Sequence, residues 1–328
     1  MAQNENSVDS SNDDIRRVSL ALGGGGARGI SHLGVLQAVT EHGFRINHIC
    51  GISIGAIAGA MYATGEPIES VQSKTLEFIH SPEFRRRRSQ MFGLTPAQGY
   101  HGNGWMQRFR KMLSAPKSVT RALRSNAILP ESVLRQVVES LLPDVAIEDL
   151  AVPFSVVAVD VLSGQRVEIE EGSLRDAVRA SASIPGVFPP VEWDGKLLCD
   201  IGVFETVPAV TAKNRADDLT VAVDVSDHII KIEGCNNILE IMTRMQHLAE
   251  NQLRKHSLVH ADVVVRPDIG RRAWFDFNEP EQLIELGRMA ASDSLSTYAS
   301  QPTPSTISIP ITSMATQSSC VAARSGSE

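Results

Sequence analysis

Short apolar runs alternate with amphipathic stretches along most of this chain. Val18–Leu22 and Ile46–Cys50 are short and mainly apolar, so each predicts a buried strand. The segments after them, Ile30–Glu41 and Ile54–Ala63, predict helices. In the first of these, apolar residues recur every three or four positions, and the second is rich in small residues. Strands that alternate with helices in this way predict an α/β fold with a mostly parallel central sheet.

The alternation continues further along the chain, without an internal repeat. More strands are expected at Phe154–Val161, Leu197–Cys199, Thr220–Val225 and Val263–Arg266. More helices are expected at Glu131–Leu142, Ser173–Ala180, Ile238–Leu258 and Glu281–Ala291. Residues 1–16 and 295–328 are rich in small polar residues and predict disordered tails around one domain over residues 17–294. Within that domain, residues 81–129 lack clear periodicity and predict an insertion.

The composition narrows the class of protein. Of the 328 residues, 42% are apolar and 21% are charged, which excludes a disordered, collagen-like or disulfide-stapled chain. The four cysteines lie far apart without a C-x-x-C pair, which argues against a zinc site and favours a reducing compartment. The first residues are polar and acidic, with no apolar run that could direct secretion, so we expect a cytoplasmic protein. No motif suggests a metal or a cofactor.

Charge is unevenly distributed. The formal net charge of −7 argues against a general nucleic-acid binder, yet residues 85–124 hold ten Lys or Arg and no Asp or Glu. This segment is either a solvated surface loop or a contact surface for anionic lipid, because apolar residues from Trp105 to Leu113 interleave with its cations. The second interpretation adds peripheral contact with the inner membrane surface. The residues that would contact lipid are Arg85, Arg86, Arg87, Arg88, Arg108, Arg110 and Lys111.

A G-x-S-x-G sequence stands between the second predicted strand and the helix after it. It reads Gly51-Ile52-Ser53-Ile54-Gly55. A sharp strand-to-helix turn would expose the Ser53 hydroxyl, and the flanking glycines would remove Cβ atoms that clash in such a turn. The helix N-terminus would also direct partial positive charge at the site. This context favours a nucleophilic serine over an incidental serine in a glycine-rich turn.

A second glycine-rich sequence, GGGGARG over residues 23–29, follows the first predicted strand. Its unobstructed N–H groups could hold a phosphate or the oxyanion of an acyl-transfer intermediate. The G-x-G-x-x-G spacing also fits a dinucleotide site, which requires an acidic residue near the end of the next strand. That strand, Ile46–Cys50, has no carboxylate and leads to the serine turn instead. Acyl transfer is therefore favoured.

This loop and serine turn together resemble the patatin-like phospholipase family, and three further stretches carry the same resemblance. Residues 179–190, RASASIPGVFPP, are similar to the family's A-S-x-x-x-P-x-x-F-x-P block. A predicted strand then ends in Asp200-Ile201-Gly202, where the family has Asp-Gly-Gly or Asp-Gly-Ala. Residues 277–291 resemble the family's closing helix. The resemblance covers residues 18–294 and is nearest to the bacterial branch related to neuropathy target esterase.

The resemblance implies a three-layer sandwich and a lipid acyl hydrolase that acts on phospholipid or lysophospholipid esters without a cofactor. Ser53 would be the nucleophile and Asp200 the base of a Ser-Asp dyad. The backbone N–H groups of Gly24, Gly25 and Gly26 would form the oxyanion hole. Supporting roles would fall to Arg28, Gly51, Gly55 and Gly202.

Two departures from the family pattern leave other functions open. Ile201 replaces a glycine, and a β-branched residue would be strained there if the turn needs a positive φ. Glu205 and Thr206 stand where relatives often have Asn-Pro. A catalytically weak lipid-binding or regulatory protein is therefore a second hypothesis, and a transacylase a third.

A Ser-His-Asp triad is a further alternative, because four histidines follow Asp200 in the chain. They are His228, His247, His256 and His260. His247 lies within a predicted helix and the last two near its end, which favours exposed or capping roles for these three.

Overall fold

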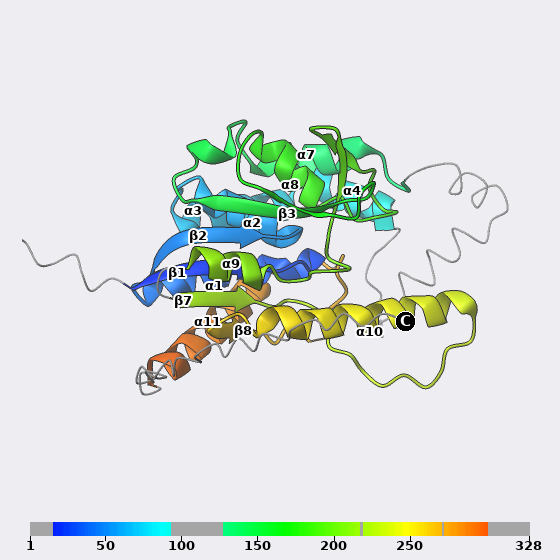
Figure 1. The fold of residues 1–328 in the computed structure, drawn as a ribbon. Coiled ribbons are helices and arrows are strands. Elements are labelled where there is room, and N and C mark those ends of the chain that lie inside the picture. Colours follow the sequence, from blue (N-terminus) through cyan, green and yellow to red (C-terminus); the bar gives the residue numbers. More distant parts are fainter. Residues whose placement is uncertain (1–15, 93–126, 217–218, 271, 301–328) are drawn as a thin grey trace, which may run out of the picture.

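The computed structural model describes residues 16–92, 127–216, 219–270 and 272–300. These residues include one eight-stranded sheet in the order β5-β6-β3-β2-β1-β7-β8, with β4 paired to β3 (Figure 1). The pairs β1–β2, β1–β7, β2–β3 and β7–β8 are parallel, and those of β3 with β4 and β6, and of β5 with β6, are antiparallel. The strands are β1 (Arg17–Leu22), β2 (Arg45–Gly51), β3 (Phe154–Asp160), β4 (Arg166–Ile169), β5 (Val191–Trp193), β6 (Lys196–Cys199), β7 (Leu219–Val223) and β8 (Val263–Val265).

Helices pack on both faces of this sheet (Figure 1). They are α1 (Ser31–Glu41), α2 (Ile54–Ala63), α3 (Ile68–His80), α4 (Pro82–Phe92), α7 (Glu131–Leu141), α8 (Leu174–Ser181), α9 (Ala209–Arg215), α10 (Ile238–Leu258) and α11 (Pro280–Ser300). Two short 3-10 helices are η1 (Gly26–Ile30) and η2 (Ile147–Asp149).

The alternation of side chains along β1 shows how the layers are built. Leu20 and Leu22 belong to the main core, which also contains residues of α1, α2 and α8. Ala21 points to the opposite face, where it packs with residues of α9 and with Leu258 at the end of α10. The sheet is therefore the middle of three layers, and the expected mostly parallel α/β architecture is confirmed.

Helix α11 covers α1 at a backbone contact. A Cβ atom on Gly34 of α1 would lie 1.8 Å from the carbonyl oxygen of Ile284, and one on Gly287 would lie 2.0 Å from that of Ser31. Both positions need glycine because the two helices approach this closely.

The structure confirms the predicted elements. With one exception, their bounds lie within two residues of the predicted bounds. The exception is α11, which continues to Ser300 because Leu295 extends its buried side. The domain end predicted at residue 294 therefore lies inside a helix, and residues 295–300 are helical rather than disordered. Residues 1–15 and 301–328 of the predicted tails lie outside the described residues.

Five strands and α-helices were not predicted from the sequence: β4, β5, α3, α4 and α9. Of these, α4 occupies residues 82–92 of the segment expected to lack periodic structure. Phe84 anchors this helix against Phe78 and Phe277. The remainder of the predicted insertion, up to residue 126, lies outside the described residues.

Candidate active site

Ser53 occupies the sharp turn between β2 and α2 that the G-x-S-x-G pattern predicts. Its backbone has φ 55° and ψ −122°, a left-handed conformation that is strained for any residue with a Cβ atom. The residue is only 8% exposed. Strain that persists at a buried serine indicates that the surrounding packing holds the turn in place.

The two glycines of the pattern make room for this turn. A Cβ atom on Gly55 would lie 2.2 Å from the carbonyl oxygen of Leu22, and one on Gly51 would lie 2.5 Å from the Cα atom of Ala56. Both contacts are with backbone, so neither can be relieved by a side-chain rotation. The supporting roles expected for Gly51 and Gly55 therefore have a steric basis.

Ser181, at the end of α8, also holds the turn. Its hydroxyl accepts a hydrogen bond from the Ser53 N–H at 3.0 Å and donates one to the Val157 carbonyl at 2.7 Å. All three groups are buried, so water cannot reach them and these hydrogen bonds satisfy them instead. The sequence pattern does not indicate this role, although Ser181 lies inside the family-like block of residues 179–190.

Asp200, in the loop after β6, lies next to Ser53 and is 7% exposed. The Asp200 N–H donates to the Ser183 carbonyl at 3.0 Å, and Oδ1 accepts a bond from the Gly202 N–H at 2.8 Å. Burial raises the pKa of Asp200 to about 6, assisted by the negative charge of Glu250. Hydrogen bonds from the Ser53 hydroxyl and the Gly202 N–H act in the opposite direction and favour the charged form.

Ile201 adopts an ordinary backbone conformation in this loop. The non-glycine residues with positive φ in the described part of the chain are Ser53, Asp194 and Glu279, so the strain considered for Ile201 is absent. Its side chain is buried with Cys50 and other apolar residues of β2, β3 and β6. The departure from glycine therefore extends an apolar cluster while Gly202 still bonds to Asp200.

The glycine loop lies against the serine turn, because a Cβ atom on Gly24 would be 3.4 Å from that of Ser53. The Gly24 N–H, however, donates to the Thr206 carbonyl at 2.9 Å. It is therefore not free to bind an oxyanion, which corrects this part of the predicted hole. The N–H groups of Gly25 and Gly26 have no acceptor among the described residues.

Arg28 braces the glycine loop. Its Nε donates to the Gly25 carbonyl at 3.1 Å, and its guanidinium forms an ion pair with Asp227 in the loop that leads to α10. On the other side of the loop, His32 Nε2 lies 2.8 Å from the Gly23 carbonyl. Burial lowers the pKa of His32 to about 4, so this imidazole is neutral at pH 7.

None of the four histidines considered for a triad hydrogen-bonds to Ser53 or Asp200. His228, His247, His256 and His260 are all exposed. The geometry of the described residues therefore favours the pair Ser53–Asp200 over a histidine-dependent triad.

The predicted lipid-contacting cations are described only in part. Arg85 and Arg86 are exposed on α4, and Arg88 donates to Asn278 Oδ1 at 3.4 Å. The Arg87 side chain and all of Arg108, Arg110 and Lys111 lie outside the described residues.

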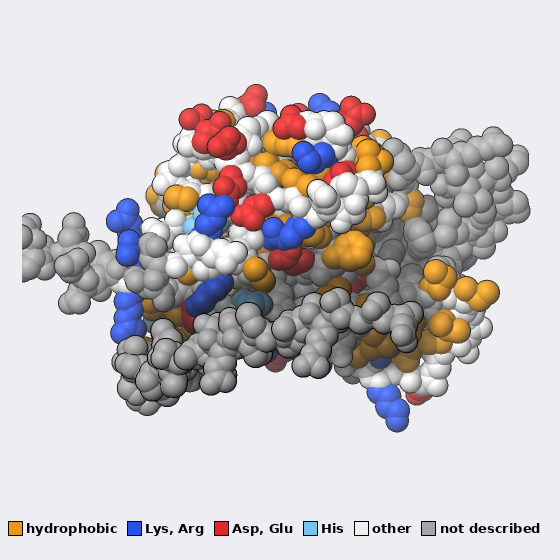
Figure 2. All heavy atoms as spheres, viewed as in Figure 1, with side chains coloured by type: hydrophobic (Ala, Val, Ile, Leu, Met, Phe, Trp, Pro, Cys, Tyr) orange, Lys and Arg blue, Asp and Glu red, His pale blue; other side chains and the backbone are white. Residues whose placement is uncertain are grey.

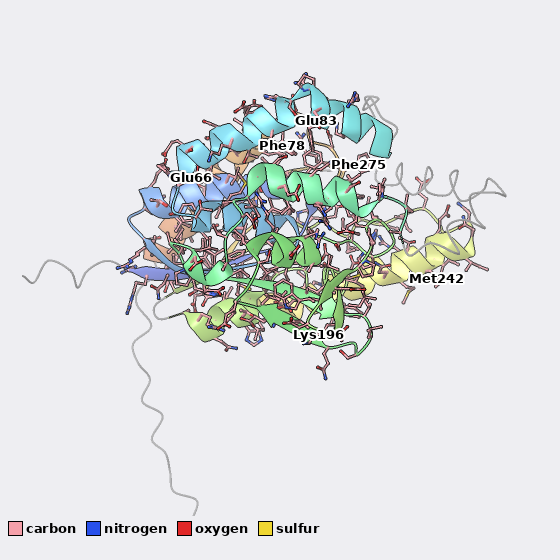
Figure 3. The ribbon with its side chains drawn as sticks, turned by 90° about the horizontal axis from the view of Figure 1, so that it is seen from above. Glu66, Phe78, Glu83, Lys196, Met242 and Phe275 are labelled. Carbon is pink, nitrogen blue, oxygen red and sulfur yellow. The ribbon has the colours of Figure 1, made fainter. Side chains whose placement is uncertain are left out.

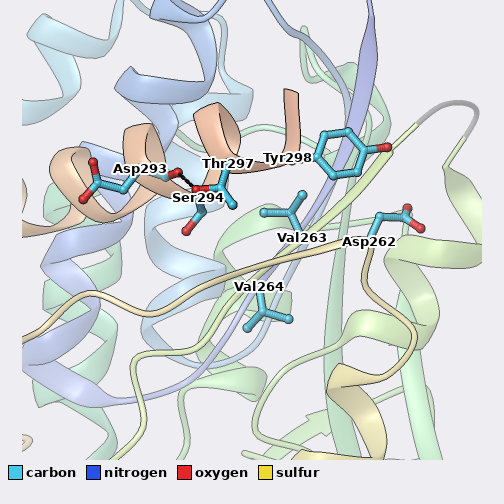
Figure 4. A pocket seen from close by; sticks show the side chains of 7 residues that line it. All are labelled: Asp262, Val263, Val264, Asp293, Ser294, Thr297 and Tyr298. Atoms are coloured by element: carbon cyan, nitrogen blue, oxygen red, sulfur yellow. Dashed lines mark hydrogen bonds between the residues drawn. The ribbon is translucent and has the colours of Figure 1, made fainter. Parts of the chain in front are cut away.

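Two hollows lie apart from the predicted site residues. One of about 350 Å³ lies between β8 and α11 and is lined in part by Asp293 and Thr297, which hydrogen-bond to each other (Figure 4). The other, of about 1010 Å³, is bordered by β4 and β5 and is rich in glutamate. Among the described residues, no three potential metal ligands converge, and no helix is both long and apolar enough to cross a membrane.

A family model of patatin-like phospholipases matches residues 20–213. This chain belongs to the patatin-like phospholipase family. Its glycine loop, serine turn and Asp200 loop all fall within the matched residues.

The curated relatives include members of the NTE family. An uncharacterized NTE family protein from Mycobacterium bovis is 35% identical over 210 residues, which is 64% of this chain and 49% of that protein. Lysophospholipase NTE1 from Eremothecium gossypii is 28% identical over 82% of this chain and 18% of its own length. The chain thus spans half or less of the length of these relatives.

The solved structures similar to this chain include VipD from Legionella pneumophila. That match has a TM-score of 0.47 and 16% sequence identity, and covers 87% of this chain and 67% of the other. The type III effector ExoU gives a TM-score of 0.37 at 14% identity, with 88% of this chain and 54% of the other covered.

Proposed function

We propose that this protein is a lipid acyl hydrolase that cleaves carboxylic esters of phospholipids or lysophospholipids through an acyl-Ser53 intermediate. The observation that carries the proposal is the strained, buried Ser53 beside a buried carboxyl of raised pKa. Membership of a family named for phospholipases, and a relative named as a lysophospholipase, support the substrate class.

The proposed reaction begins with transfer of the Ser53 hydroxyl proton to Asp200 as Oγ attacks the ester carbonyl carbon. A base with a pKa near 6 is a better proton acceptor than an ordinary aspartate, and it is still ionised at pH 7. The carbonyl oxygen becomes an oxyanion, which the N–H groups of Gly25 and Gly26 would stabilise together with the N-terminus of α2.

Collapse of this intermediate breaks the ester bond, and the leaving alcohol takes the proton from Asp200. Asp200 then removes a proton from water, whose oxygen attacks the acyl carbon. A second collapse releases the fatty acid and returns the proton to Ser53. The side chains that carry protons in this scheme are Ser53 and Asp200, while Arg28 and Ser181 hold the glycine loop and the serine turn.

A catalytically weak lipid-binding or regulatory protein is the second hypothesis, and the replacement of glycine by Ile201 is one of the two departures behind it. Ile201 has no positive φ and packs in an apolar cluster, which supports the hydrolase over this second hypothesis.

The test is hydrolysis of a medium-chain nitrophenyl ester and of a lysophospholipid by the wild type, Ser53→Ala and Asp200→Asn. We expect both variants to lose activity by a factor on the order of 10³ or more. Ser155→Ala removes another buried hydroxyl, on β3, and should retain the wild-type rate. Equal rates in the wild type and Ser53→Ala would overturn the proposal.

A further inference from the structure

Helix α10 carries an apolar face that no described residue covers. Ile238, Ile241, Met242, Met245 and Leu253 lie along one side of the helix at helical spacing, and we call these five the α10 apolar face. Ile238 is 77% exposed, Met242 65% and Met245 60%. Figure 2 shows hydrophobic side chains gathered at the projecting end of α10, and Figure 3 labels Met242 there. Contiguous exposed apolar side chains mark an interaction surface.

The other half of α10 is joined to the candidate active site. Arg254 donates to the Asp227 carbonyl at 3.2 Å, and the Asp227 carboxylate pairs with Arg28 of the glycine loop. Glu250 lies one helical turn before Arg254, near enough to Asp200 for its negative charge to raise the pKa of that carboxyl. A surface bound by the α10 apolar face is therefore held at a fixed position relative to Ser53.

The charges along α10 favour an anionic or zwitterionic occupant over a basic one. Between Glu240 and Glu250 the charged residue of the helix is Arg244, and there is no acidic residue. Arg244 donates to the carbonyl of Ile230, which stands exposed in the loop before α10. Apolar side chains flanked by a cation on a projecting helix are typical of segments that lie in a lipid interface.

We propose that the α10 apolar face inserts into the surface of phospholipid vesicles or micelles and brings the Ser53 site to its aggregated substrate. This inference rests on the proposed function, because an enzyme for water-soluble esters would have no use for such contact. The unbranched methionine side chains suit a disordered acyl layer, since they adapt to irregular surroundings. The competing interpretation is that a second copy of this chain covers the α10 apolar face, and the experiment below distinguishes the two.

The experiment compares the full-length wild type with Met242→Asp/Met245→Asp. The control, Ser132→Asp/Gln136→Asp, adds the same charge to exposed positions of α7. Flotation with vesicles of phosphatidylcholine and phosphatidylglycerol measures binding. Hydrolysis of a short-chain nitrophenyl ester, which is monomeric in solution, measures the site itself. Size-exclusion chromatography measures the oligomeric state.

We expect the α10 variant to lose vesicle binding by at least about tenfold, and the control variant to bind as the wild type does. Both should hydrolyse the monomeric ester at the wild-type rate, which also shows that they are folded. Unchanged vesicle binding by the α10 variant would overturn the inference. So would a wild-type dimer that becomes a monomer in the variant without a loss of vesicle binding. If the wild type binds vesicles through this face but cleaves no ester, the proposed function fails while the docking surface stands.

Discussion

Replacing Asp200 by asparagine should stabilise the fold at neutral pH while it abolishes activity. The pKa of Asp200 is about 6 against an ordinary value of 3.8, and a tenfold difference in proton affinity corresponds to about 1.4 kcal/mol. Keeping this carboxyl ionised in the folded protein therefore costs about 3 kcal/mol. Asparagine has the same shape, carries no charge and retains an oxygen that can accept the Gly202 N–H.

The sign of the pH dependence follows from the direction of the shift. A carboxyl whose pKa is higher in the folded state favours folding when protonated, so it destabilises the wild type increasingly from about pH 4 to about pH 6. We expect Asp200→Asn and the wild type to have similar free energies of unfolding near pH 4. Above about pH 7 the variant should be more stable by about 3 kcal/mol.

Urea denaturation at both pH values measures this difference, because the other groups titrate alike in the two proteins. An Asp200→Asn variant that is no more stable than the wild type at pH 8 would refute the argument that desolvation sets the pKa of this carboxyl. In the wild type, the same pKa should appear as a fall in kcat/KM below about pH 6, because protonated Asp200 cannot accept the Ser53 proton.

Three further predictions concern the packing around the site. Ser181→Ala leaves the Ser53 N–H and the Val157 carbonyl without their buried partner. We expect the free energy of unfolding, measured by urea denaturation, to fall by about 1–3 kcal/mol and kcat to fall as well. An unchanged kcat would show that Ser181 does not support the serine turn. Ile201→Gly should cost about 2–5 kcal/mol of stability without raising kcat, whereas a gain in kcat would show that the isoleucine weakens the dyad. Gly34→Ala should force α1 away from α11 and lower the Tm by several degrees, and an unaltered Tm would contradict the close approach of these helices.

The sequence alone was sufficient to predict the elements whose hydrophobic pattern is strong. The apolar run of β1 and the apolar spacing of α1 predicted both elements, and the serine turn followed from its glycines. Two elements that were not predicted, α3 and α4, nevertheless have local sequence patterns that indicate a helix. Ile68, Val71, Thr75 and Ile79 form the buried side of α3 at helical spacing, and Ser81 caps α4 by accepting the Phe84 N–H.

Other features depend on contacts that no local pattern contains. The strands β4 and β5 are short and carry charged residues, so their pairing partners rather than their own sequences define them. Ser181 accepts a hydrogen bond from the Ser53 N–H across 128 residues of chain, and the Thr206 carbonyl accepts one from the Gly24 N–H across an even longer stretch of sequence. The raised pKa of Asp200 likewise arises from burial in the folded site.

Covalent labelling tests most directly whether Ser53 is an activated nucleophile. The wild type is treated with a fluorophosphonate at pH 8, and the labelled protein is analysed by intact mass and peptide mapping. Parallel samples contain Ser53→Ala, Asp200→Asn and the control Ser155→Ala. We expect one phosphonyl group on Ser53 in the wild type and in Ser155→Ala, none in Ser53→Ala, and much slower labelling in Asp200→Asn. A wild type that stays unlabelled, or one labelled at a different residue, would contradict the Ser53–Asp200 account.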